Sequence, residues 1–173
     1  MVIIITGPSH VGKTLLAQKL LEKYKYPYIS IDHLKMGLIR SGNTSLTPDD
    51  DDALTEYLWP IVTEMIKTAI ENKQNLIVEG CYIPPTWRID LDELYLESLQ
   101  FICLTMTDEY IDKNYEEIIR HESDIESRLI EADCTKEGLM QCNRWFIDAF
   151  NQAGEKTVII SEDYEKAIAQ LID

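Results

Sequence analysis

Short, nearly continuous apolar runs alternate along this chain with longer segments in which apolar residues recur every three or four positions. The apolar runs predict β-strands at 2–6, 27–31, 75–80, 100–104 and 157–161. The longer segments predict helices at 13–24, 33–40, 47–70, 91–99, 107–138, 142–153 and 164–172. Strands that are apolar throughout are buried on both faces. The pattern therefore predicts an α/β fold, a five-stranded parallel sheet with helices on both faces.

Two of the predicted helices carry further local signals. Thr47 followed by Pro48 predicts a helix start with Thr47 as the capping residue, and Pro60 predicts a kink in the same helix. The four aspartates at 49–52 are interpreted as an acidic helix N-terminus rather than as a metal site. In the helix at 142–153, the aromatic residues are expected to face the core: Trp145, Phe146 and Phe150.

The first predicted strand runs directly into the sequence GPSHVGKT at residues 7–14, which matches the P-loop pattern GxxxxGK[ST] at every fixed position. The two glycines allow φ > 0, and backbone N–H groups of such a loop surround phosphate oxygens at the start of the next helix. The residues expected to bind a nucleotide through this loop are Gly7, Pro8, Ser9, His10, Val11, Gly12, Lys13, Thr14 and Leu15. Lys13 would contact the β- and γ-phosphates, whereas His10 occupies a variable position and is interpreted as a spacer.

Length, charge and cysteine content limit the class of protein. A chain of 173 residues is expected to form a single domain, spanning 1–173. A formal net charge of −15 would repel nucleic acid and anionic membranes, so neither is expected as a partner. No apolar run is long enough for a transmembrane helix. The cysteines lack metal-site spacing and are read as reduced thiols, which predicts a cytoplasmic protein: Cys81, Cys103, Cys134 and Cys142.

Three polar residues lie at the carboxyl ends of predicted strands, namely Thr6, Asp32 and Glu79. In a parallel sheet, ligands bind at the carboxyl ends of the strands, so these side chains are expected to converge on one cleft. Glu79 with the Thr14 hydroxyl would hold Mg²⁺, the alternative for Glu79 being a carboxylate in a turn. Asp32 would accept the proton of an acceptor hydroxyl or help to hold the metal, the alternative being the cap of the helix at 33–40.

Basic residues near the expected cleft are candidates for binding the acceptor. Lys35 and Arg40 follow the second strand and Arg88 follows the third, with exposed surface residues as the alternative. Arg120 and Arg128 lie eight residues apart, about two helical turns, so one helix face could bring both to the transferred phosphoryl group as a lid at about 107–141. The alternative is that these arginines pair with neighbouring acidic residues.

The order of these features resembles the small P-loop kinases, which include adenylate, shikimate and gluconate kinases and the chloramphenicol and zeta-toxin phosphotransferases. The segment ISIDHLKMGLIRSG at 29–42 also looks like bacterial adenylate kinase-like or 2-phosphoglycerate kinase-like proteins. The resemblance implies a three-layer P-loop NTPase fold with a helical lid. It also implies that Asp32 contacts the acceptor hydroxyl and that Arg120 and Arg128 are lid arginines.

The chain departs from adenylate kinase at two places. It has no threonine-glycine-aspartate step after the second strand, and after the third strand it reads EGCY at 79–82 in place of a glycine-x-proline-arginine turn. It also lacks the NKxD box of GTPases. The sequence therefore favours an ATP- and Mg²⁺-dependent kinase of a small hydroxylated, anionic metabolite. A regulatory ATPase and a toxin-type phosphotransferase acting on a nucleotide-sugar are the alternatives, and the oligomeric state is left open.

Overall fold

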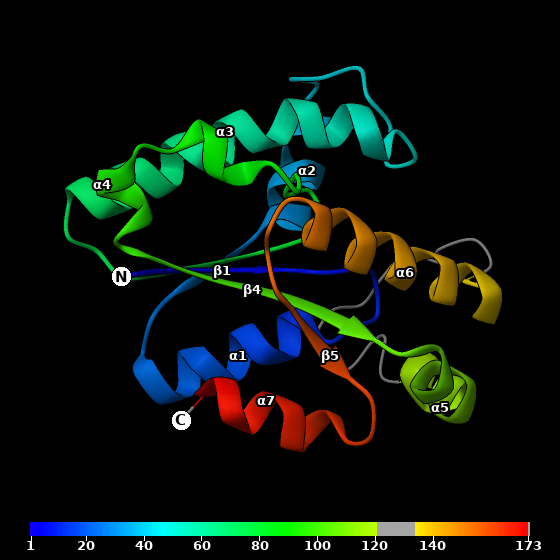
Figure 1. Cartoon of the computed structure of the whole chain (residues 1–173). Coiled ribbons are helices and arrows are strands. Elements are labelled where there is room, and N and C mark those ends of the chain that lie inside the picture. Colours follow the sequence, from blue (N-terminus) through cyan, green and yellow to red (C-terminus); the bar gives the residue numbers. More distant parts are fainter. Residues whose placement is uncertain (121–133, 173) are drawn as a thin grey trace.

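The computed structural model describes residues 1–120 and 134–172, and its centre is a five-stranded sheet with helices on both faces (Figure 1). The strands are β1 (Val2–Thr6), β2 (Tyr28–Ser30), β3 (Leu76–Glu79), β4 (Leu99–Met106) and β5 (Thr157–Ile160). Their order in the sheet is β2-β3-β1-β4-β5, and each neighbouring pair is parallel. The predicted α/β fold with five parallel strands is confirmed.

The helices and the short 3₁₀ turn that connect the strands are α1 (Lys13–Tyr24), α2 (Ile31–Arg40), α3 (Asp51–Glu71), η1 (Trp87–Asp90), α4 (Glu93–Leu96), α5 (Asp108–Arg120), α6 (Lys136–Gln152) and α7 (Tyr164–Ile172). In Figure 1, α1 and α7 lie on one face of the sheet, and α3 and α6 lie on the other. Among the described residues, no helix is both long and apolar enough to cross a lipid bilayer.

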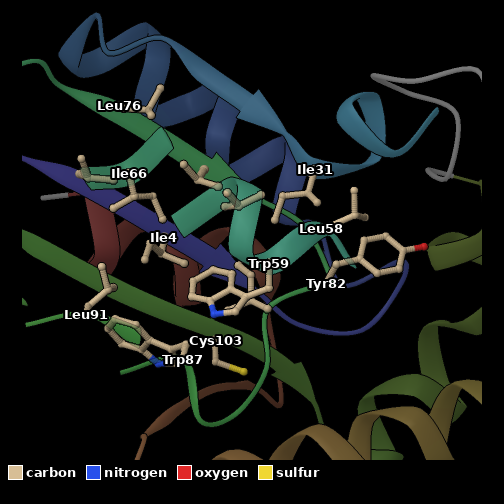
Figure 2. Packing of buried hydrophobic residues seen from close by; sticks show 14 of the residues in the cluster. Ile4, Ile31, Leu58, Trp59, Ile66, Leu76, Tyr82, Trp87, Leu91 and Cys103 are labelled. Atoms are coloured by element: carbon tan, nitrogen blue, oxygen red, sulfur yellow. The ribbon is translucent and has the colours of Figure 1, made fainter. Parts of the chain in front are cut away.

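The central strand β1 contributes apolar side chains to both faces, which is why it reads as an uninterrupted apolar run. Val2 and Ile4 belong to the cluster under α3 and α6, while Ile3 and Ile5 belong to the cluster under α1 and α7. Figure 2 shows the first cluster, in which Ile4 lies among residues from α3 and from the segment after β3. Burying an aliphatic side chain of this size contributes about 1.5–3 kcal/mol, so β1 anchors both layers.

Two predicted helix starts are wrong by a few residues. Helix α2 begins at Ile31, so Asp32 lies in its first turn and is neither the end of a strand nor the helix cap. Helix α3 begins at Asp51 rather than near Thr47. The Thr47 backbone N–H and hydroxyl both donate to Asp50 Oδ2, at 2.7 and 2.8 Å, and this local turn replaces the predicted cap.

The region after β4 also differs from the prediction. In place of helices at 107–138 and 142–153, the described residues contain α5, which ends at Arg120, and α6, which begins at Lys136. Thr135 Oγ1 accepts a hydrogen bond from the Gly138 N–H and caps α6. The predicted end of the lid, at about residue 141, therefore falls inside this helix. Arg128 and the middle of the predicted lid lie outside the described residues.

Three smaller expectations have mixed outcomes. Phe146 and Phe150 are buried as predicted, because residues four apart share one face of the helix, whereas Trp145 points away from that face of α6 and is 56% exposed. The predicted helix at 91–99 is the single turn α4, and β4 is longer than predicted at both ends. Pro60 lies inside α3, which continues to Glu71.

Candidate active site

The phosphate-binding loop connects β1 to α1 at the carboxyl edge of the sheet. Its backbone enters the left-handed region at His10, with φ of 66°, and at Gly12, with φ of 87°. Turns of this kind direct successive N–H groups inward and form anion-binding sites. Lys13 is 6% exposed and its ammonium group donates to the Pro8 carbonyl at 2.8 Å, so its charge lies over the loop.

A tyrosine from the last helix closes the loop from outside. The Tyr164 hydroxyl donates to the Gly12 carbonyl at 2.7 Å, across 152 positions in the sequence. A Cβ atom at Gly12 would lie 2.6 Å from the Tyr164 ring, closer than real Cβ contacts. Gly12 is therefore required both for its φ and for the space that Tyr164 fills. Burial of this phenol raises the pKa of Tyr164, so the hydroxyl remains a donor to the loop over the physiological range.

The two predicted magnesium ligands lie next to each other. Register pairs Ile5 of β1 with Glu79 of β3, which brings the end of β3 beside the loop that leaves β1. The Thr14 hydroxyl donates to Glu79 Oε2 at 3.4 Å. Within the described residues, no group of three or more His, Cys, Asp or Glu side chains could hold a metal ion by itself. Two oxygen donors suit Mg²⁺, because this ion keeps several waters and is shared with substrate phosphates.

Close packing brings helix α2 to the same edge. A Cβ atom at Gly80 would lie 2.8 Å from the Ile31 Cβ, so the absence of a side chain lets the start of α2 approach β3. Ser30 pairs in register with Glu79 and is 2% exposed, and its hydroxyl is a buried group without a hydrogen-bond partner in the described structure. The first turn of α2, which carries Asp32, is thereby held beside the end of β3.

Asp32 belongs to a hydrogen-bonded network that joins α2, the segment after β3 and α3. The Lys35 ammonium lies 2.9 Å from Asp32 Oδ1 and donates to the Tyr82 hydroxyl at 2.8 Å. The Tyr82 hydroxyl in turn donates to Asp51 Oδ1 at 3.1 Å. Tyr82 is 3% exposed, and Figure 2 shows its hydroxyl directed away from the other labelled residues of the apolar cluster. The network therefore forms a polar wall on the edge of the core.

Cys81 stands between Glu79 and Tyr82 in the sequence, and the pKa of its thiol depends on burial and on the charges around it. Burial raises the pKa of the Cys81 thiol to about 11, while the nearby positive charge of Lys13 acts in the opposite direction. Asp32, Lys35 and Asp51 also act on Cys81, so the phosphate-binding loop and the wall lie close to the same thiol. Burial likewise raises the pKa of Tyr82, with Cys81 and the two aspartates adding to the effect. Both groups are thus neutral near pH 7.

Several of the residues predicted to bind the acceptor or to form the lid do not lie at the candidate site. Arg88 forms an ion pair with Glu155, which precedes β5, and its guanidinium lies over the Trp87 ring, so the expectation that it binds the acceptor is not supported. Arg40 is exposed at the far end of α2, about 12 Å along the helix axis from Asp32. Arg120 is exposed at the end of α5, and Arg128 is outside the described residues.

Sequence reasoning missed Tyr82, Asp51 and Tyr164 as site residues. Tyr82 stands only three positions after Glu79, which was a usable signal, whereas Asp51 was one of four consecutive aspartates with nothing to distinguish it. Tyr164 lies 152 positions from Gly12, and no local pattern links them. Within the loop itself, His10 Nδ1 lies 3.8 Å from the Cys134 sulfur.

Comparison with solved structures identifies the fold. The chain is similar to a sugar kinase from Janibacter sp. HTCC2649, with 17% identity, a TM-score of 0.60 and coverage of 99% of this chain and 91% of that chain. It is also similar to a shikimate kinase from Bacteroides thetaiotaomicron, with 15% identity, a TM-score of 0.57 and coverage of 99% and 96%. A gluconokinase from Sinorhizobium meliloti 1021 matches at 17% identity, a TM-score of 0.53 and coverage of 98% and 92%.

No protein-family model matches the sequence, and no curated protein matches it significantly. The similarity to known proteins is therefore structural and concerns the fold. The chain shares its fold with these kinase structures, which confirms the three-layer α/β architecture that the sequence resemblance implied.

Proposed function

We propose that this protein is an ATP-dependent kinase that phosphorylates a hydroxyl group of a small metabolite. The observation that carries the proposal is the contact of Thr14, in the first turn of α1, with Glu79, at the carboxyl end of β3; their oxygens lie 3.4 Å apart. A phosphate-binding loop with an adjacent acid supplies the donor side of phosphoryl transfer. Kinase neighbours with the same fold support this class of reaction.

The residues of this chain divide the reaction into a donor side and an acceptor side. The loop at 7–14 binds the phosphates of ATP, with Lys13 on the charge that develops during transfer. Thr14 and Glu79 hold Mg²⁺, which when bound neutralises phosphate charge. Asp32 takes the proton of the acceptor hydroxyl, whose oxygen forms a bond to the γ-phosphorus as the bond from that phosphorus to the bridging oxygen breaks. The products are the phosphorylated acceptor and ADP.

We further propose a lid and a cellular setting. Arg120 and Arg128 are proposed to approach the transferred phosphoryl group when the lid closes. The four cysteines, all of them among the described residues, form no disulfide, which supports a reducing compartment such as the cytoplasm. The net charge of −15 argues against nucleic acid as a partner.

The proposed function is tested by acceptor-dependent release of ADP. Purified protein is incubated with Mg-ATP and hydroxylated metabolites, and a coupled assay measures ADP with and without each acceptor. Lys13→Ala should abolish acceptor-dependent release, because it removes the charge that stabilises the transition state. Lys156→Ala, at an exposed position before β5, is the matched control and should retain the activity. ADP release that needs no acceptor would instead support the regulatory ATPase.

A further inference from the structure

The wall beside the phosphate-binding loop carries more negative than positive charge. It contains two carboxylates, Asp32 and Asp51, and one ammonium group, Lys35. Lys35 is already engaged, since it contacts both Asp32 and the Tyr82 hydroxyl and also lies 4.9 Å from the centre of the Tyr82 ring. Its side chain is only 12% exposed. The positive charge of Lys35 is therefore largely balanced within the protein.

The hydrogen-bonding capacity that remains in the wall favours donors in the ligand. Tyr82 uses its proton on Asp51 and accepts from Lys35, so its hydroxyl is engaged in both directions. Asp32 and Asp51 each have a second carboxylate oxygen that can accept further hydrogen bonds, and Lys35 has a third proton to donate. The ligand that complements this wall is rich in hydroxyl or ammonium donors.

The surroundings of the wall add negative charge. Asp51 is one of four consecutive aspartates at 49–52, at the start of α3. The Thr47 N–H and hydroxyl lower the pKa of Asp50, so this neighbouring group stays ionised. An acceptor with a carboxylate or phosphate would meet like charges at this wall, and the repulsion is only partly screened near a protein surface.

We propose that the acceptor site selects a hydroxylated molecule without an acidic group, a neutral or amine-bearing polyol, through Asp32, Lys35, Asp51 and Tyr82. This inference rests on the proposed kinase function and specifies its acceptor. It reverses the expectation of an anionic acceptor, which depended on Lys35, Arg40 and Arg88 as binding cations. In the structure, Lys35 is paired with Asp32, Arg88 is paired with Glu155, and Arg40 lies at the other end of α2.

The test is a panel of acceptors matched in size and differing in charge. Glucose, glucosamine and gluconate form one set, and glycerol, serinol and glycerate form another, embedded in a wider library sorted into neutral, amine-bearing and acidic members. Acceptor-dependent ADP release is measured with Mg-ATP, and the ratio of kcat/KM between the classes is the readout. The best acceptor is expected to be neutral or amine-bearing. An acidic best acceptor would overturn this inference and leave the kinase function standing.

If no member of any class supports acceptor-dependent ADP release, the proposed function fails and this inference fails with it. The two failures are therefore distinguishable. The specific role of the wall is tested with Asp51→Asn, which keeps the shape and can still accept a hydrogen bond from Tyr82. We expect the preference for the best acceptor over its acidic counterpart to fall about tenfold, the scale of one hydrogen bond to a charged group.

Asp52→Asn is the matched control, because it removes the same charge from the next position of α3, and in the described structure Asp52 makes no hydrogen bond or ion pair with the wall. Its selectivity should stay within about twofold of the parent, as for other surface substitutions. Equal changes in Asp51→Asn and Asp52→Asn would overturn the assignment of selectivity to the wall, because general surface charge would then explain both.

Discussion

The Thr14 hydroxyl lies 3.4 Å from Glu79 Oε2, although 65 positions separate the two residues in the sequence. One belongs to the first turn of α1 and the other ends β3. Their contact follows from the parallel pairing of β1 with β3, which aligns the carboxyl ends of the two strands. It brings together an oxygen pair of the kind that Mg²⁺ prefers in proteins.

Glu79→Gln should weaken the magnesium dependence of the reaction. The amide keeps the shape of the side chain but loses the charge that attracts the metal. The Mg²⁺ concentration for half-maximal activity should rise about tenfold or more, as for other groups that orient a metal site. Activity is titrated with Mg²⁺ at saturating ATP, with Glu97→Gln, an exposed position, as the control. An unaltered titration would mean that Glu79 has a structural role alone.

Asp32→Asn should lose turnover while keeping the fold and the affinity for ATP. A general base contributes roughly 10²–10⁴-fold to rate, and an amide cannot take up the proton. The ion pair with Lys35 is partly exposed, so its loss should change the free energy of unfolding by no more than about 1 kcal/mol. Steady-state kinetics, ATP binding and urea unfolding together separate the two effects. If turnover is retained, the proton acceptor is another group.

Tyr164→Phe should destabilise the protein modestly without abolishing nucleotide binding. The substitution removes the hydrogen bond to the Gly12 carbonyl but keeps the ring beside the loop, so we expect a loss of about 1 kcal/mol in urea unfolding. Tyr24→Phe is the matched control, since its hydroxyl donates to the exposed carbonyl of Ile172.

Gly12→Ala should be far more damaging than either tyrosine variant. The new Cβ would strain a residue at φ of 87° and would overlap the Tyr164 ring. Loss of ATP binding is expected, measured by calorimetry. Normal ATP affinity in Gly12→Ala would contradict the assigned loop geometry.

The stability of the protein should fall as the pH rises above about 9. The pKa of Cys81 is raised by burial from an ordinary value of 9.0 to about 11, so the folded state holds this proton where the unfolded chain releases it. The associated stability is complete below pH 9 and is lost as the pH rises towards 11. Urea unfolding of Cys81→Ala across this range should show a shallower decline than the parent. Identical slopes would show that Cys81 does not carry the effect.

The sequence alone was sufficient to predict the phosphate-binding loop and the order of the strands along the chain. Both are encoded locally, because glycine spacing, a following Lys-Thr pair and apolar periodicity each act within a few residues. The assignment of Glu79 to the end of a strand was correct for the same reason. Helix starts were predicted less accurately. The predicted start of α3 near Thr47 was wrong, because Thr47 donates its hydrogen bonds to Asp50 instead of capping the helix.

Only the tertiary structure decided which polar groups meet in the wall and what net charge they carry there. Lys35, Arg40 and Arg88 read alike as cations near strand ends, yet one pairs with Asp32, one lies at the far end of α2 and one pairs with Glu155. Tyr82 and Asp51 meet because α3 packs over the segment that leaves β3. Such contacts depend on how layers far apart in sequence come together, and the energies of their ion pairs and hydrogen bonds depend on burial that no local pattern records.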